Sequence, residues 1–248
     1  MIYEKGEVVS ATKCDVKANL SLIGAVELVQ DNICFYFGNM KIDQIIMKNH
    51  HNAIWMYTKN KLKFYHDLTW NDKFLLRCFI SQITPVRLIV DTVFFNDNKD
   101  IALYSKVELC LFDLENHKLK RITPDIISPD YACHKSLMDY SYDKLLFDDS
   151  FTLVDEVKIR AGNIDYCIHT NNIEYLRFIL NTFNVKMLAE ERFKEVEIHY
   201  LAQSKENDTI QIYKSKCNDK HDFLIKHVAK DIIKCRIITE HKLRDKFE

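Results

Sequence analysis

Apolar residues recur three and four positions apart in two stretches of the chain, residues 21–37 and 172–183. This spacing predicts a helix in each stretch, with one face turned toward a core. The first stretch also carries apolar residues outside that stripe, so we expect its helix to be buried on most sides. Asn171 and Asn172 precede the second stretch and are good N-cap residues. The chain is therefore predicted to contain two helices, each at the start of its own half.

Alternating and β-branched runs surround both helices and predict strands. In the first half, the 54–66 and 73–83 runs flank the polar turn DLTWND, which predicts a hairpin within an antiparallel meander. The expected strands are residues 7–14, 54–66, 73–83, 86–95 and 100–114 in the first half, and 151–160, 194–203, 208–214 and two within 223–240 in the second.

The two halves repeat the same order of elements. Setting Asp15 on Asp165 superimposes the two predicted helices, and KLKFYHDLTWNDKFLLR then lies without gaps over EIHYLAQSKENDTIQIY. Matched element order favours duplication. Between the copies lies a segment with Pro124 and Pro129, which is typical of a linker. We therefore expect an N-terminal domain at 1–130, a linker at 131–150 and a C-terminal domain at 151–248.

Composition narrows the class of protein. The 248 residues include 35 basic and 36 acidic side chains, and this balance gives no support to a nucleic-acid binder. We find neither a secretory leader nor a run of 18 apolar residues, so the expectation is a cytoplasmic protein without a membrane span. The 8 cysteines never form CxxC, which makes structural zinc and a disulfide framework weak hypotheses.

Candidate chemistry gathers just ahead of the second helix. Asp165, Cys167 and His169 fall two apart, and an extended backbone would put all three side chains on one face. The helix N-terminus that follows offers unpaired backbone N–H groups and a partial positive charge. A carbonyl placed there can be attacked with His169 and Asp165 beside it. The first copy has Asp15 opposite Asp165 but Asn19 opposite His169, so the full set exists only in the second half.

Several segments together resemble the acyl-acyl-carrier-protein (acyl-ACP) thioesterases, double-hotdog enzymes of fatty-acid synthesis. The segments are LSLIGAVELVQDN, AIWMYTKNKLKFYHDLTWND, YSKVELCLFDLENHKLKRI, IDYCIHTNNIEYL and VEIHYLAQSKENDT. The resemblance covers most of the chain and implies an α+β fold of two tandem hotdog domains, each an antiparallel sheet wrapped around a long central helix. It also implies hydrolysis of a fatty acyl thioester on acyl carrier protein, with the acyl chain in the first domain and no metal or organic cofactor.

The family's working pattern is Asp-x-Asn-x-His before the helix, with a Glu after the next strand. Asp165 and His169 match it, whereas Cys167 stands in place of the Asn and Gln203 in place of the Glu. Gln is no general base, so His169, oriented by Asp165, is expected to activate water, or Asp165 acts through a water. Gln203 and Cys167 complete the expected pocket. Cys167 as a nucleophile remains an alternative.

Two other functions stay open. A non-catalytic acyl-thioester binding protein fits because half of the catalytic pattern is altered. A hotdog hydratase resembles D-x-N-P-x-H, with Asp and His five apart, and the spacing of four here argues against it. The Lys-rich segments KNKLK and ENHKLKR are candidates for docking an acidic carrier protein, although charge runs are usually solvated faces. Acyl chain length, preference for carrier protein or coenzyme A, and oligomeric state, a homodimer included, are left open.

Overall fold

The computed structural model describes residues 1–132, 134–137, 141–147 and 150–241. Contacts within the chain divide it into two compact units. Unit 1 contains Met1–Cys14 and Asn19–Tyr142, and unit 2 contains Asp15–Ala18 and Asp143–Glu248. The expected linker, 131–150, includes residues 133, 138–140 and 148–149, which lie outside the described residues.

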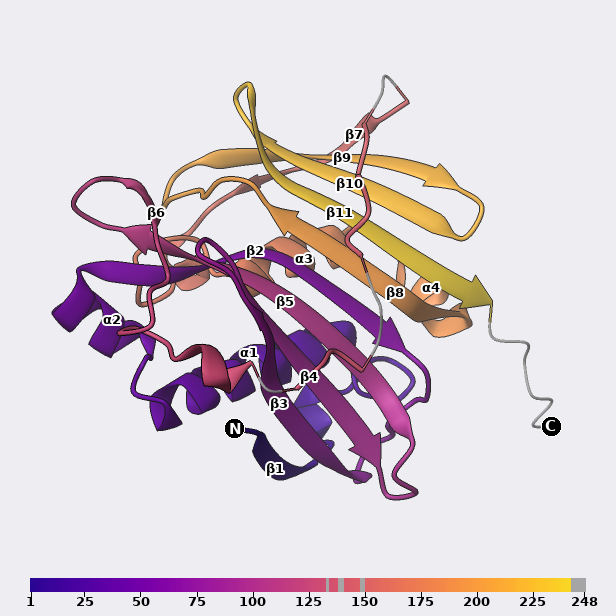
Figure 1. Ribbon diagram of the computed structural model, residues 1–248. Helices are drawn as coiled ribbons and strands as arrows, with labels where there is room; N and C mark the ends of the chain where they lie inside the picture. The colour runs from indigo at the N-terminus through magenta and orange to yellow at the C-terminus, as the bar shows by residue number, and fades with distance from the viewer. Residues whose placement is uncertain (133, 138–140, 148–149, 242–248) are drawn as a thin grey trace. The chain divides into compact units, whose positions relative to one another are not determined.

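Unit 1 is built on an antiparallel sheet in the order β1-β3-β4-β5-β2, with β6 paired to β5. Helix α1 lies along one face of this sheet (Figure 1). It begins after Ser21, whose Oγ accepts the Gly24 N–H at 2.9 Å, and it buries apolar side chains along its length. The elements are β1 (Tyr3–Val8), the 3-10 helix η1 (Ala11–Lys13), α1 (Leu22–Asn39), α2 (Gln44–His51), β2 (Ala53–Phe64), β3 (Lys73–Ile83), β4 (Leu88–Asn96), β5 (Ile101–Asp113), β6 (Lys118–Lys120) and the 3-10 helix η2 (Pro129–Tyr131).

Three predictions for unit 1 are corrected. The expected hairpin of β2 and β3 is wrong, because β2 pairs with β5 on the far side of the β3-β4-β5 meander. The strand expected over 7–14 ends at Val8 and gives way to η1. Helix α2 was not predicted, since it is only 8 residues long and lies where polar residues cluster. Its start is fixed by Asp43, whose Oδ1 accepts the N–H groups of Ile45 and Ile46.

Unit 2 has an antiparallel sheet in the order β8-β11-β10-β9-β7, with α3 against one face (Figure 1). The sequence also predicts that the 194–203 and 208–214 runs pair around the turn SKEND. This prediction is wrong, because β8 pairs with β11 and β9 pairs with β10 and β7. The elements are β7 (Thr152–Lys158), the 3-10 helix η3 (Ala161–Asn163), α3 (Asn172–Asn181), α4 (Val185–Glu190), β8 (Glu191–Tyr200), β9 (Thr209–Cys217), β10 (Lys220–His227) and β11 (Lys230–His241).

The same backbone hydrogen bonds occur in each copy of the repeat, at the positions that the alignment of the two copies predicts. Ser21 N–H donates to Lys13 O at 2.8 Å, and Asn171 N–H donates to Asn163 O at 2.8 Å. Further along, Val9 N–H donates to Asp72 O and Asn71 N–H to Val9 O; Ile159 N–H likewise donates to Asp208 O and Asn207 N–H to Ile159 O. Matched bonds at matched positions confirm the internal repeat.

Within the described residues, no helix has both the length and the apolar content that a membrane crossing requires.

Candidate active site

Residues 165–169 form a turn and not the extended segment that the alternating pattern predicted. Ile168 N–H donates to Asp165 O at 2.9 Å, and Asp165 N–H donates to His169 O at 2.9 Å. The Asp165 Oδ1 accepts the Cys167 N–H at 2.8 Å, closing a side-chain turn. Because the backbone reverses here, Asp165, Cys167 and His169 do not line one face of a strand.

Asp165 therefore has a structural role that the first copy shares. Asp15 Oδ1 accepts the Lys17 N–H at 2.8 Å, and Ala18 N–H donates to Asp15 O. Both turns end with a residue of positive φ, 59° at Ala18 and 63° at Ile168. Asp165 is hydrogen-bonded to His169 through main-chain atoms. It therefore affects the imidazole by fixing the shape of the turn.

His169 leaves this turn next to the start of α3. Its side chain is partly buried, and its Nδ1 atom is inaccessible to solvent and has no hydrogen-bond partner among the described residues. Asn171 caps α3 as the sequence predicts, with Oδ1 accepting the Ile173 N–H at 3.0 Å. Since Nδ1 is closed to solvent, Nε2 is the nitrogen through which this imidazole can exchange a proton with water.

A buried network of hydroxyl groups joins the residue after His169 to the segment after β8. Thr170 N–H donates to Ser204 O at 3.1 Å, and their hydroxyls are 2.8 Å apart. The Tyr175 hydroxyl lies 2.8 Å from Ser204 Oγ and accepts the Ser204 N–H at 3.0 Å. Burial raises the pKa of Tyr175, so the phenol stays neutral and able to donate.

This network places Gln203 near the candidate histidine. Gln203 is exposed and immediately precedes Ser204, while His169 immediately precedes Thr170, the residue bonded to Ser204. The network itself was missed from sequence. The available signal was the internal repeat, since Thr170, Tyr175 and Ser204 stand where the first copy has Leu20, Ala25 and Leu68.

Cys167 lies within the turn and is partly buried, with its backbone amide held by Asp165. Of the four residues expected at the site, Asp165, Cys167 and His169 thus come from one turn. Gln203 comes from the segment after β8 that the Thr170–Ser204 bonds tie to it.

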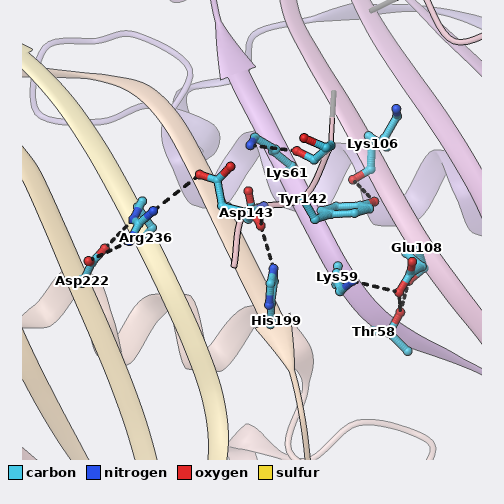
Figure 2. A network of polar contacts seen from close by, with 12 residues as sticks. Thr58, Lys59, Lys61, Lys106, Glu108, Tyr142, Asp143, His199, Asp222 and Arg236 are labelled. Atoms are coloured by element: carbon cyan, nitrogen blue, oxygen red, sulfur yellow. Dashed lines mark hydrogen bonds and ion pairs between the residues drawn. The ribbon is translucent and has the colours of Figure 1, made fainter. Parts of the chain in front are cut away.

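A second polar cluster in unit 2 joins Asp143 to side chains of β8 and β11 (Figure 2). Among the described residues, Asp143, Glu195 and Glu197 form a group whose carboxylate oxygens lie within 4.8 Å of one another, close enough to hold a cation. Glu197 Oε1 is 2.6 Å from His199 Nε2 and accepts the Asp143 N–H at 2.8 Å. Arg236 lies 3.5 Å from the Asp143 carboxylate. The carboxylates of this cluster thus already contact hydrogen-bond donors and the Arg236 guanidinium. This geometry fits a network that stabilises the fold.

Known proteins match the C-terminal part of the chain by sequence and nearly the whole chain by structure. Residues 148–243 match the family model of the acyl-ACP thioesterase C-terminal domain. An acyl-ACP thioesterase from Bacteroides thetaiotaomicron superposes with a TM-score of 0.88 at 15% identity, over 96% of this chain and 98% of that one. The 12:0-ACP thioesterase from Umbellularia californica gives a TM-score of 0.86 at 12% identity, over 97% and 98% of the two chains. No curated protein sequence matches the chain. The structural likeness shows the fold.

Proposed function

We propose, from the premise that residues 148–243 belong to the acyl-ACP thioesterase C-terminal domain family, that this protein hydrolyses fatty acyl thioesters. The family match supports a thioester hydrolase, and we propose acyl carrier protein as the carrier of the acyl group. The observation that carries the chemical proposal is the position of His169 directly ahead of the N-terminus of α3, with Nδ1 buried and Nε2 left to meet water.

In the proposed reaction, the thioester carbonyl lies at the start of α3 with its oxygen toward the Asn172 N–H. The N–H groups of Asn171, Ile173 and Glu174 already donate to other acceptors. His169 takes a proton from water as the water oxygen attacks the carbonyl carbon. The tetrahedral intermediate then expels the thiolate, which receives the proton from the imidazolium. Free fatty acid and the carrier thiol are the products. Asp165 keeps the turn in shape, and Gln203 and Cys167 line the pocket.

We further propose that the two units are tandem hotdog domains, each with its helix as the central element. Residues 1–130 would hold the acyl chain and residues 151–248 the catalytic groups, with 131–150 as the linker. An open hollow of about 960 Å³ on unit 1 is lined by charged side chains such as Lys73, Arg77 and Asp97 beside Phe74 and Phe95. The hollow is open to solvent and mixes charged with apolar side chains, so we place the acyl pocket against α1, whose apolar side chains are buried.

Two residues favour a second candidate function, a non-catalytic acyl-thioester binding protein. Gln203 supplies no general base, and Cys167 lacks the two amide donors of an Asn. The same scaffold would then bind the thioester without cleaving it.

Chromatographic detection of free fatty acid, after incubation with acyl-ACP and acyl-coenzyme A panels, tests the proposal. His169→Ala is expected to lower kcat by about 10²–10⁴-fold. Asn19→Ala, the matched change in the first copy, is expected to leave turnover intact. Turnover that persists in Cys167→Ala identifies water as the attacking group. Binding of acyl thioesters with no release by the wild type would refute hydrolysis and establish the binding protein.

A further inference from the structure

A row of polar side chains crosses one face of the unit 1 sheet. Cys78 on β3 pairs with Thr92 on β4, and Thr92 pairs with Ser105 on β5. Directly opposed residues of antiparallel strands project from the same face, so the three side chains are neighbours. All three are fully buried. Asn60 on β2 is also buried and extends the row, because the Ser105 hydroxyl donates to its Oδ1 at 2.9 Å.

This polar row, Cys78, Thr92, Ser105 and Asn60, faces α1. The Phe37 ring on α1 lies 5.5 Å from the Trp55 ring on β2, centroid to centroid, and Trp55 pairs with Leu111 on β5. Leu111 and Ser105 are an even number of positions apart on one strand, so their side chains project from the same face. The polar row is therefore inside unit 1, between its sheet and its helix.

Asn32 on α1 projects into the same interior. It is 1% exposed and lies one turn before the fully buried Tyr36, whereas the adjacent Asp31 is exposed. Its Nδ2 donates to Leu28 O at 2.8 Å, but its Oδ1 is closed to solvent and has no hydrogen-bond partner among the described residues. Leaving a buried acceptor without a donor opposes folding, and a donor on a bound ligand would remove that penalty.

This part of α1 lies close to the polar row. Tyr3 on β1 pairs with Cys78, which continues the row to the edge of the sheet. The Tyr36 hydroxyl donates to Met1 O at 2.9 Å, two residues before Tyr3, and Lys5 Nζ, two residues after Tyr3, lies 5.1 Å from the centre of the Phe35 ring. The last turns of α1 therefore run beside the β1 end of the row, and Asn32 is one turn away.

The polar atoms of this interior are suited to a ligand group that donates a hydrogen bond. Thr92 Oγ1 donates to Cys78 Sγ at 3.6 Å, and Ser105 Oγ donates to Asn60 Oδ1. Because each hydroxyl gives its one proton to these bonds, its oxygen can still accept but has nothing further to donate. Asn32 Oδ1 is an acceptor as well. A hydroxyl on a ligand can donate to such a set, whereas an oxo group cannot.

The second copy does not repeat these hydroxyl and amide groups. Ser105 pairs with Leu62, and Cys235 pairs with Ile198, the residue that matches Leu62 in the aligned repeat. The residues of unit 2 at the positions of Thr92, Ser105 and Asn60 are Phe223, Cys235 and Val196. The fold therefore forms without polar oxygen atoms at these three positions. Thr92 is also smaller than Phe223, so the row in unit 1 takes up less of the space between sheet and helix.

We propose that the acyl chain released by this protein carries a hydroxyl group, which donates to Asn32 Oδ1 when the chain lies against α1. The proposal rests on the proposed function, in which unit 1 holds the acyl chain. A plain alkyl chain would leave Asn32 Oδ1 unpaired and would place methylene groups against the polar row. A hydroxyl on the chain instead regains there the hydrogen bond that it loses on leaving water. The substrates are then hydroxyacyl thioesters, and the products are hydroxy fatty acids.

The test uses acyl-ACP substrates of one chain length that carry no substituent, a hydroxyl or an oxo group. The substituent is moved carbon by carbon along the chain, and kcat/KM is measured from the free acid released. Binding of the corresponding free acids to the His169→Ala variant is measured by calorimetry, where no turnover intervenes. The variants are Asn32→Leu and Thr92→Val, and Asn39→Leu is the control, because it makes the same change at an exposed position of α1.

The wild type is expected to favour the best hydroxyacyl chain over the plain chain by about tenfold in kcat/KM, at one preferred position of the hydroxyl. The oxo chain should gain nothing over the plain chain. Asn32→Leu should reduce the preference to about twofold or less, chiefly by improving the plain chain, and Thr92→Val should reduce it in part. Asn39→Leu should match the wild type.

Equal kcat/KM for plain and hydroxylated chains at every position would overturn the proposal. A hydroxyl preference that survives in both Asn32→Leu and Thr92→Val would do so too, and an equal gain for the oxo chain would contradict the argument from acceptors. If no thioester is hydrolysed, the proposed function fails. Tighter binding of a hydroxy acid than of the plain acid, lost in Asn32→Leu, would still support the hydroxyl site in that case.

Discussion

His221 offers a direct test of how burial controls the acid stability of unit 2. Its side chain on β10 is fully buried, and neither ring nitrogen has a hydrogen-bond partner among the described residues. The ring lies 5.0 Å from the Phe183 ring, centroid to centroid. Burial, together with the positive charges of Lys214 and Lys216 on β9, lowers the pKa of His221 to about 4. Glu191, with Oε2 3.6 Å from Nε2, opposes them.

The effect on stability follows from linkage between protonation and folding. An unfolded histidine takes up a proton below about pH 6.5, whereas the folded chain excludes that proton from His221 until about pH 4. The unfolded state is therefore favoured by about 1.4 kcal/mol per pH unit across this window. The contribution of His221 is intact above pH 6.5, and about 3 kcal/mol of stability is lost by pH 4.

Urea unfolding of wild type and His221→Leu at intervals from pH 7 to pH 4 measures this loss. The variant has no proton to exclude, so its advantage over the wild type should grow by about 3 kcal/mol on acidification. Repeating the pair in a Glu191→Gln background removes the titration of the neighbouring carboxylate, and His50→Leu controls for the loss of an exposed histidine. Wild-type and variant curves that run parallel from pH 7 to pH 4 would refute the reasoning.

Five further substitutions test the local structure. Tyr175→Phe leaves the buried Ser204 N–H without its acceptor, and should lower the free energy of unfolding by about 1–3 kcal/mol, measured by urea denaturation; no loss would contradict the role of the network. Ile168→Gly and Ala18→Gly each relieve a positive φ and should raise Tm, more for the β-branched residue; a lower Tm in Ile168→Gly would argue against strain at that turn. Arg236→Met removes the hydrogen bonds at 2.7 and 3.0 Å to Asp222, which keeps only the more distant Lys220 at 3.8 Å, and should destabilise by about 2 kcal/mol. Lys194→Met, which removes a 61% exposed lysine paired with Glu240 at 3.5 Å, should cost less than about 1 kcal/mol, and equal losses for the two would refute the burial argument.

The helices and the repeat could be predicted because their determinants are local. Apolar spacing predicted α1 and α3 to within a few residues, and Asn171 was predicted as the cap of α3. The hydrogen bonds confirm the alignment of the copies. Helix α2 was too short for a periodic pattern. Strand neighbours were mispredicted because pairing joins residues far apart in sequence, as in the contact of β2 with β5.

Sequence patterns also failed to predict the local conformation and some of the contacts of the candidate site. The residue types at 165, 167 and 169 drew attention to this segment, but their alternation suggested a strand. A single side-chain hydrogen bond, from Cys167 N–H to Asp165 Oδ1, favours a turn instead. Ser204 and Tyr175 were not expected at the site, because only tertiary packing brings them to Thr170.

The sequence by itself determined the two helices, the duplication and the segment that carries the candidate chemistry, since each depends on residues within a few turns or on comparison of two copies. Tertiary structure decided the order of the strands, the burial of His221, the unpaired nitrogen of His169 and the row of Cys78, Thr92 and Ser105 inside unit 1. Burial and hydrogen bonding at these positions depend on segments distant in sequence, and no local pattern records which segments will meet.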